Sequence, residues 1–277
     1  MFRRLGARVG YDGALALALP CVGAGVLLEA HLRTSVADAE PAAACRYASN
    51  ARLLTEARVA ALARDGIVVI PGVVAAERVA AARADAGCIH AERGERSLAV
   101  ADERRDDVCW IRASDGTPAA ASAPLRGCAP LAAATLHCLR TVRGVAHELA
   151  RADSGGTGLR LRVPRQCQLA RYRADEAVGY ERHLDQCELG LADMGLLEWL
   201  RASDYRDRRV TAILYLNPAW EPAHGGHLRC FTGDDDEAFF DVEPRGGTLV
   251  IFDSTRVEHA VLPSRAPRYA LTCWMCI

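Results

Sequence analysis

Residues 242–274 read VEPRGGTLVIFDSTRVEHAVLPSRAPRYALTCW, and this stretch decides the fold class. Three short runs rich in β-branched, aromatic and other apolar residues, TLVIFD, HAVLP and RYALTCW, are separated by segments that contain Gly, Pro, Ser and Asp. Such runs, punctuated by turn residues, are typical of short strands joined by turns. The C-terminal part of the chain is therefore expected to be β-structure.

The same pattern extends upstream to about residue 164. Further strands are predicted in QCQLARY (166–172), YERHLD (180–185), VTAILYLN (210–217), HLRCF (227–231) and FFDVEP (239–244). Eight strands within about 110 residues indicate a barrel or a double-sheet jelly roll.

Helices are expected ahead of these strands. Residues 53–66, LLTEARVAALARDG, predict a helix with an N-cap at Thr55 and a stop at Gly66, followed by a strand in IVVI. A second helix is expected at about residues 75–86 and a long one between 118 and 150, with a charged stretch at 92–107, predicted to be a solvated loop, leading to a short strand at about 108–112. The predicted class is α+β, mainly β, with N-terminal helices packed on one face of a sheet.

One spacing in the predicted strands points to a metal. His183 and Asp185 are two residues apart, so both side chains leave the same face of a strand and can reach one ion. Such a triplet is common by chance, and an exposed His beside an Asp is the ordinary alternative. His259, at the start of a later strand, can supply a third ligand, and two imidazoles with one carboxylate leave positions free for iron(II) chemistry. The same set also occurs in zinc hydrolases, so the metal stays open at this point.

An arginine distinguishes the iron(II) interpretation from the zinc hydrolase interpretation. Arg268 lies nine residues after His259, far enough to turn at the prolines and return on the neighbouring strand. Its guanidinium can hold a carboxylate with two hydrogen bonds, which suits the distal carboxylate of a keto acid chelated to iron. A zinc hydrolase has no need for such an anchor, although a surface arginine is the ordinary reading of Arg268 taken alone.

Taken in order, HLD, VTAILYLNPAW, GGHLRCF and VEPRGGTLVIFDSTRVEHAVLPSRAPRYALTCW resemble the prolyl 4-hydroxylase family of Fe(II)- and 2-oxoglutarate-dependent dioxygenases, nearest to the hypoxia-inducible-factor prolyl hydroxylase type. The resemblance implies a double-stranded β-helix. It also implies that Tyr215 donates its hydroxyl to the distal carboxylate beside Arg268 and that Tyr172 approaches the iron-bound co-substrate. Thr272 and Ile213 would line the same pocket, with ordinary strand packing as the alternative.

The resemblance further implies an activity. Oxidative decarboxylation of 2-oxoglutarate to succinate and CO2 would be coupled, through Fe(2+) and dioxygen, to hydroxylation of C4 in a prolyl residue of a polypeptide, with L-ascorbate keeping the iron ferrous. A 2-oxoglutarate oxygenase acting on another protein side chain or a small molecule is the alternative enzyme. An inactive binding module of the same fold is the alternative outside enzymes.

Nucleic acid is not an expected partner. Lys plus Arg total 34 against 35 for Asp plus Glu, so there is no global attraction to polyanions. Nucleic-acid demethylases with a similar constellation carry a second arginine six residues after the first, where this chain has Trp274. The remaining histidines that stand out, His137, His147, His224 and His227, are interpreted as helix or loop residues.

The substrate-selecting parts and the N-terminus are the least defined by the sequence. The connection at 186–208 is longer than in the hypoxia-type enzymes and predicts a short amphipathic helix, either a lid or a helix packed on the barrel. Residues 1–51 are predicted to be an extension ahead of a catalytic domain at 52–277, and the apolar run at 13–28 resembles a signal peptide or short anchor.

The expected compartment follows from the cysteines. Eleven cysteines in no regular spacing favour free thiols in a reducing compartment, and Cys273 and Cys276 are interpreted as strand residues without a metal. The expected location is cytoplasmic or nuclear, with anchoring in the endoplasmic reticulum membrane as the alternative.

Overall fold

The computed structural model describes residues 39–42, 45, 52–93, 95–96, 106–112, 132–152, 160–174, 179–186, 207–233 and 237–277. Its helices are α2 (Glu56–Asp65), α3 (Ala76–Arg93), α4 (Ala133–Ala152) and a 3-10 turn, η3 (Pro222–His224). Its strands are β1 (Glu40–Pro41), β2 (Ile67–Ile70), β3 (Glu95–Arg96), β4 (Asp107–Arg112), β5 (Arg162–Val163), β6 (Gln166–Tyr172), β7 (Tyr180–His183), β8 (Arg208–Tyr215), β9 (Leu228–Phe231), β10 (Phe239–Val242), β11 (Leu249–Asp253), β12 (His259–Val261) and β13 (Arg268–Cys276).

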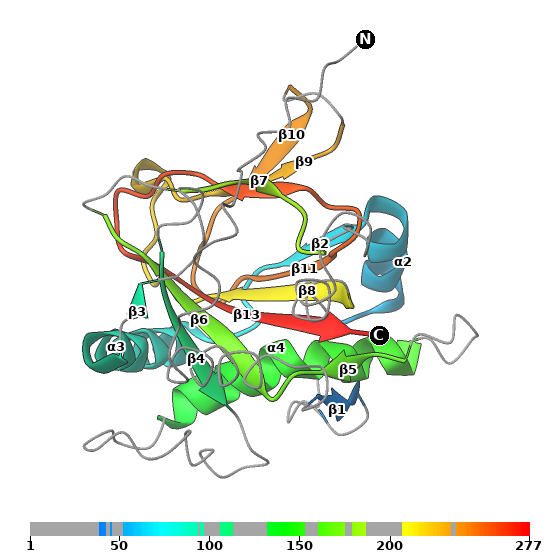
Figure 1. Ribbon diagram of the computed structural model, residues 1–277, viewed down its shortest axis with the longest axis horizontal. Coiled ribbons are helices and arrows are strands. Elements are labelled where there is room, and N and C mark those ends of the chain that lie inside the picture. The colour runs from blue at the N-terminus through cyan, green and yellow to red at the C-terminus, as the bar shows by residue number, and fades with distance from the viewer. Residues whose placement is uncertain are drawn as a thin grey trace, which may run out of the picture.

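Within these ranges the strands form two antiparallel sheets that face each other (Figure 1). The larger sheet has the order β2-β11-β8-β13-β6-β4-β3, with β1 and β5 at its side, and the smaller has the order β10-β9-β12-β7. From β6 to β13 the chain passes back and forth between the sheets, with only β9 and β10 consecutive in the same sheet, which is the connectivity of a jelly roll. The predicted double-stranded β-helix is confirmed.

Both faces of the larger sheet are covered, one by the helices and the other by the smaller sheet. Side chains along each strand point alternately to these two faces. On β8, Ala212 and Leu214 join the core beneath the helices, whereas Ile213 and Tyr215 join a second core between the two sheets. Side chains of the candidate site come from this second, inner face.

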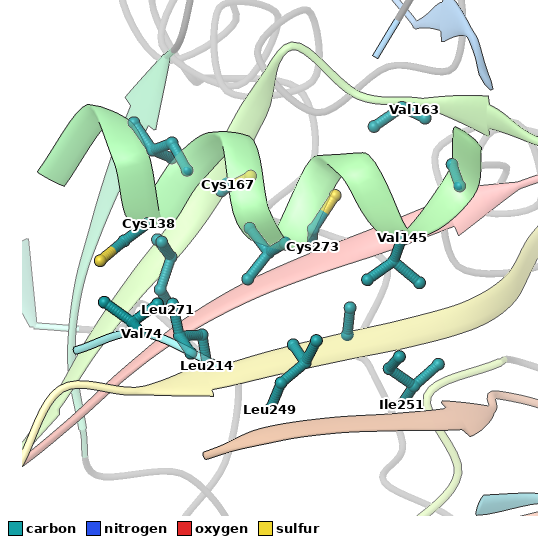
Figure 2. Packing of buried hydrophobic residues seen from close by; sticks show 14 of the residues in the cluster. Val74, Cys138, Val145, Val163, Cys167, Leu214, Leu249, Ile251, Leu271 and Cys273 are labelled. Atoms are coloured by element: carbon teal, nitrogen blue, oxygen red, sulfur yellow. The ribbon is translucent and has the colours of Figure 1, made fainter. Parts of the chain in front are cut away.

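Helix α4 covers the outer face of the larger sheet, running along β8 and β13 (Figure 1). The packed side chains are Cys138 and Val145 from α4 and Leu214, Leu249, Ile251, Leu271 and Cys273 from the strands (Figure 2). Each fully buried Leu or Ile of this kind contributes about 1.5–3 kcal/mol to stability. This layer holds the sheet rigid, and therefore fixes the residues on its opposite face.

Most of the predicted elements are confirmed, and two are corrected. All eight predicted C-terminal strands are present, and α2 begins after the N-cap Thr55 and ends at Gly66, which has a left-handed φ of 77°. Helix α3 is longer than expected because Ala82, Ala86 and His90, four residues apart, continue its buried stripe. The charged stretch is not entirely a loop, since it contains the end of α3 and the paired strand β3.

Part of the N-terminal segment packs on the domain. Glu40–Pro41 pairs with β5, and Glu40 forms an ion pair with the buried Arg143 of α4. The boundary near residue 52 stays a prediction. Among the described residues no helix is long and apolar enough to cross a membrane. The predicted anchor at 13–28 and nearly all of the connection at 186–208 lie outside the described residues.

The cysteines and the remaining histidines agree with their predicted roles. Every cysteine in the described part of the chain is a free thiol, and Cys273 and Cys276 lie buried on β13. His137 and His147 lie in α4, and His224 ends η3, ahead of His227 in the following loop.

Candidate metal and co-substrate site

Two antiparallel strands of the smaller sheet bring the predicted metal ligands together. His183 ends β7 and lies directly opposite His259, the first residue of β12. Asp185 follows two residues later, with its Oδ1 3.8 Å from Nε2 of His183 and its Oδ2 4.0 Å from Nε2 of His259. One ligand atom from each residue lies within 4.8 Å of the others, which is close enough for all three to bind one ion.

Backbone carbonyls orient both imidazoles toward this point. Nδ1 of His183 donates to the carbonyl of Glu181 at 2.7 Å, and Nδ1 of His259 donates to the carbonyl of Val257 at 3.1 Å. A carbonyl can only accept, so each Nδ1 carries the proton and each Nε2 keeps its lone pair for a metal.

Asp185 is held as a carboxylate by its surroundings. Thr211 donates a 2.6 Å hydrogen bond to its Oδ2 and also exchanges a hydrogen bond of 2.8 Å with Ser254. Burial acts to raise the pKa of Asp185, but the nearby His259, Arg208 and His183, together with the Thr211 hydroxyl, lower it below its ordinary value. A buried, ionised carboxylate between two imidazoles is the donor set of a divalent transition metal.

Arg268 provides a buried positive charge elsewhere on the inner face. Its side chain is 2% exposed, and its Nε donates to the carbonyl of Gly226 at 2.8 Å. The guanidinium carbon lies 5.0 Å from the ring centroids of both Tyr172 and Tyr215. No carboxylate of the described residues pairs with it. An unpaired buried guanidinium is costly, so this position favours an anionic ligand.

Tyr215 adds a hydrogen-bond donor beside that charge. Its hydroxyl is buried and has no hydrogen-bond partner among the residues that the structure describes. Burial raises the pKa of Tyr215 to about 12, against the opposing effect of the Arg268 guanidinium. The hydroxyl therefore keeps its proton at neutral pH and is available to a carboxylate. We refer to Arg268 and Tyr215 as the carboxylate anchor.

The three remaining predicted residues share this inner face. Tyr172 lies opposite Arg268 across β6 and β13, and Thr272 lies opposite Ile213 across β13 and β8. All three side chains are buried. Ile213 and Tyr172 belong to the inner core, which agrees with both a lining and a packing role.

The residues present fit iron(II) and 2-oxoglutarate. The triad offers two neutral imidazoles and one carboxylate, and it leaves coordination positions for a bidentate ligand and dioxygen. The carboxylate anchor supplies a cation and a free donor, both buried, for the second carboxylate of a dicarboxylic acid.

Known proteins are similar to the part of the chain that contains this site. Residues 167–276, which include all three ligands and the anchor, match the sequence profile of the 2OG-Fe(II) oxygenase superfamily. This segment of the chain is therefore similar to that superfamily. Two curated proteins from Homo sapiens that are similar to part of this chain are the prolyl hydroxylase EGLN3, 46% identical over 70 residues, and Egl nine homolog 1, 44% identical over 69 residues. The matches cover 24% of this chain, but only 28% and 16% of those two proteins.

Solved structures extend the similarity beyond this segment. A prolyl-4-hydroxylase from Pseudomonas putida is 28% identical, with a TM-score of 0.57, and the match covers 79% of this chain and 97% of that one. A Trichoplax adhaerens prolyl hydroxylase, solved with a peptide fragment of hypoxia inducible factor, has a TM-score of 0.55 at 20% identity, covering 79% and 86% of the two chains. This second likeness supports the oxygenase fold alone.

Sequence reasoning missed the residues that support the site. Thr211 and Arg208 contact Asp185, and the carbonyl of Gly226 holds Arg268 in place. Thr211 is four residues from Tyr215 on the same strand, so both side chains point to the inner face. This spacing was the signal in the sequence from which Thr211 could have been found. Gly226 stands in a Gly-Gly pair with a left-handed φ of 63°, where a Cβ would lie 3.0 Å from Cδ of Arg268.

Proposed function

We propose that this protein is an Fe(II)- and 2-oxoglutarate-dependent dioxygenase that hydroxylates C4 of prolyl residues in a polypeptide. The observation that carries the proposal is the pairing of two features in one inner face. These are a complete His-Asp-His triad and a buried guanidinium and hydroxyl that lack an anionic partner among the described residues. The first feature accounts for the metal and the second for the dicarboxylic co-substrate.

Each group of the chain has a defined task in this reaction. His183, Asp185 and His259 would hold Fe(2+), which with 2-oxoglutarate and dioxygen supplies the oxidation. Arg268 and Tyr215 would bind the distal carboxylate of 2-oxoglutarate and so orient it toward the metal. Apolar side chains of the inner face, including Val250 and Phe252, would help to exclude water from the reacting atoms. Positioning and exclusion of water are the main contributions of the protein.

The choice of a prolyl substrate is supported by the relatives. The Pseudomonas protein, matched over nearly its whole length at 28% identity, is described as a prolyl-4-hydroxylase, and the curated match EGLN3 is named a prolyl hydroxylase. The fold by itself does not select a substrate, since one fold hosts many reactions. A carbocyclase, SnoK, also superimposes with a TM-score of 0.53 at 18% identity.

The proposal is tested by the products. Purified protein is incubated with Fe(II), 2-oxoglutarate and a panel of proline-containing peptides. Succinate release is followed together with peptide mass, and the expected result is a gain of one oxygen on a proline, located at C4 by fragmentation and comparison with a 4-hydroxyproline standard. Succinate without any peptide oxidation would instead favour a small-molecule substrate.

A pair of variants assigns the activity to the site. His183→Ala is expected to abolish succinate release, because one metal ligand is lost. His147→Ala, on α4 and away from the triad, is the matched control and is expected to keep the wild-type rate. Full activity of His183→Ala would contradict the proposal.

The reductant and the compartment belong to the same proposal. Ascorbate would maintain iron in the ferrous state between turnovers, and adding it is expected to prolong linear succinate release. The proposed location is cytoplasmic or nuclear, with anchoring in the endoplasmic reticulum membrane as the alternative, and the free thiols of the described residues are what supports the first. A fluorescent fusion of the whole chain, compared with one lacking residues 1–40, tests this location.

A further inference from the structure

The two residues of the carboxylate anchor come from neighbouring strands, at the place where the pairing of those strands ends. Tyr215 is the last residue of β8, and Arg268 is the first residue of β13. The last residue pair between the two strands joins Tyr215 to Ala270, which is two residues beyond Arg268. Arg268 therefore lies past the end of regular pairing with β8, and something else must hold it at a fixed distance from Tyr215.

The side chain of Asn217 takes the place of the missing backbone bond. The N–H of Leu216 donates to the carbonyl of Tyr269 at 3.1 Å, and regular antiparallel pairing would return a bond from the N–H of Tyr269 to Leu216. That N–H donates instead to Oδ1 of Asn217 at 2.7 Å. Nδ2 of Asn217 donates to the carbonyl of Tyr269 at 3.1 Å. The amide of Asn217 thus binds Tyr269 as a peptide group of a neighbouring strand would.

A third hydrogen bond ties the same amide to another segment. Nδ2 of Asn217 also donates to the carbonyl of Pro244 at 2.8 Å, in the turn that leads to β11. Gly246 of this turn donates its N–H to the carbonyl of Asn217 at 2.9 Å. Asn217 is 2% exposed, and both N–H groups and the oxygen of its amide are used. One side chain therefore joins the end of β8, the start of β13 and the turn before β11.

This junction fixes the guanidinium of the carboxylate anchor. The side chain of Tyr269 belongs to the core beneath the helices, where the guanidinium carbon of Arg83 lies 3.6 Å from its ring centroid. The side chain of the preceding Arg268 points to the opposite, inner face. Any movement of the backbone that Asn217 holds therefore changes the distance from the Arg268 guanidinium to the metal triad.

We propose that Asn217 is a positioning residue that sets the length of the dicarboxylic co-substrate that the site accepts. This inference rests on the proposed function, in which the metal triad holds one end of 2-oxoglutarate and the carboxylate anchor holds the other. A fixed separation between these two points fits one chain length. The homologue 2-oxoadipate, one methylene longer, carries its distal carboxylate past the position at which Asn217 holds Arg268. One methylene is worth about 10–200-fold in discrimination between substrates.

Asn217→Ala tests this role, because it removes the three side-chain hydrogen bonds and releases Tyr269. The quantity measured is the ratio of kcat/KM for 2-oxoglutarate to kcat/KM for 2-oxoadipate, followed by release of succinate and of glutarate. This ratio is expected to fall about tenfold relative to the wild type, since a released β13 lets Arg268 meet the longer diacid. A smaller fraction of folded protein would lower both values by the same factor and leave the ratio unchanged.

Two further variants complete the test. Ile251→Val is the matched control for stability, because Ile251 is fully buried beneath α4 on the face away from the site (Figure 2). Loss of its methyl group lowers the melting temperature, and the ratio is expected to stay at the wild-type value. Asn217→Ser keeps a small polar group and is expected to lower the ratio in the same direction as Asn217→Ala, so the test does not depend on the folding of one variant.

Binding gives a readout that does not depend on turnover. With Mn(II) in place of Fe(II), titration calorimetry measures the Kd of each oxo acid for the wild-type protein and the variants. The preference for 2-oxoglutarate over 2-oxoadipate, expressed as the ratio of the two Kd values, is expected to shrink about tenfold in Asn217→Ala.

The outcomes separate the two proposals. If the wild-type protein neither binds 2-oxoglutarate with Mn(II) nor releases succinate, the proposed function fails and takes this role with it. If the wild-type protein is active but both Asn217 variants keep its ratio, whatever their melting temperatures, the positioning role alone is wrong. Equal use of both oxo acids by the wild-type protein, or an equal fall of the ratio in Ile251→Val, would also overturn it.

Discussion

The hydroxyl of Thr211, on β8 of the larger sheet, donates a 2.6 Å hydrogen bond to Oδ2 of Asp185, which lies two residues beyond the end of β7 of the smaller sheet. The bond ties the carboxylate ligand of the smaller sheet to the rigid larger sheet. A partner of this kind fixes the orientation of a metal ligand before the metal binds.

Thr211→Val is therefore expected to weaken iron binding without removing a ligand. Valine has the same shape, but it leaves Oδ2 of Asp185 without this donor. The Fe(II) concentration for half-maximal succinate release should rise about 10–100-fold, the usual cost of losing such a partner. Thr141→Val is the matched control, because its hydroxyl binds the carbonyl of His137 within α4, and its iron requirement should match the wild type. An unchanged requirement in Thr211→Val would show that the bond does not orient Asp185.

The orphaned hydroxyl of Tyr215 leads to a prediction with two readouts. Tyr215→Phe removes a buried group that has no partner among the described residues, so the melting temperature without ligand should be equal to or above that of the wild type. The KM for 2-oxoglutarate should rise about 5–30-fold, which corresponds to the roughly 1–2 kcal/mol of one hydrogen bond to a carboxylate. A clear loss of thermal stability with no change in KM would assign the hydroxyl to structure instead.

Gly226 controls the placement of Arg268. Gly226→Ala adds a Cβ that would lie 2.9 Å from Oγ of Ser264 and 3.0 Å from Cδ of Arg268, so the guanidinium must shift. The KM for 2-oxoglutarate is expected to rise about tenfold, comparable to losing one charge-assisted hydrogen bond. Gly72→Ala is the control for backbone strain, because Gly72 has a φ of 67° but nothing within 4 Å of its Cβ position. Both variants should lose about 1 kcal/mol of stability, and only Gly226→Ala should change the KM.

The parts of the site that the sequence predicted are those set by local pattern. His183 and Asp185 were predicted from the two-residue period of a strand, although β7 ends at His183 and Asp185 lies two residues beyond it. The ends of α2 needed only the chemistry of Thr55 and Gly66. His259 and Arg268 followed because their order along the chain suits returning strands.

The parts that were missed depend on which strands become neighbours. Thr211 meets Asp185 only once the two sheets face each other, and Asn217 meets Tyr269 only because β8 and β13 become neighbours. The charged stretch before β4 was interpreted as solvated because nothing local shows that Asp107 is buried and paired with Arg171 and Arg173. Pairing of this kind is tertiary, and no window of the sequence contains it.

The burial of His90 could not be predicted from the sequence for the same reason. We expect this residue to make the folded protein less stable in acid. Its ring lies 5.4 Å from that of Tyr269, and its Nδ1 lies 3.5 Å from Sγ of Cys109. Burial, assisted by the positive charge of Arg171, lowers the pKa of His90 to about 4, although Asp107 opposes the shift. The unfolded chain has the ordinary value of about 6.5 and binds a proton first as the pH falls. The contribution of neutral His90 to stability is therefore complete above about pH 6.5 and is lost as the pH falls from there to about 4.

His90→Phe is expected to remove this acid sensitivity. Phenylalanine fills the space of the ring but cannot bind a proton, so the drop in unfolding free energy between about pH 7 and about pH 4.5 should shrink by about 2 kcal/mol relative to the wild type. Urea unfolding at the two pH values measures the difference, and carboxylates elsewhere cancel because both proteins carry them. His224→Gln, in the η3 turn, is the control and should keep the wild-type drop. An equal drop in His90→Phe and the wild type would mean that other groups cause the loss of stability in acid.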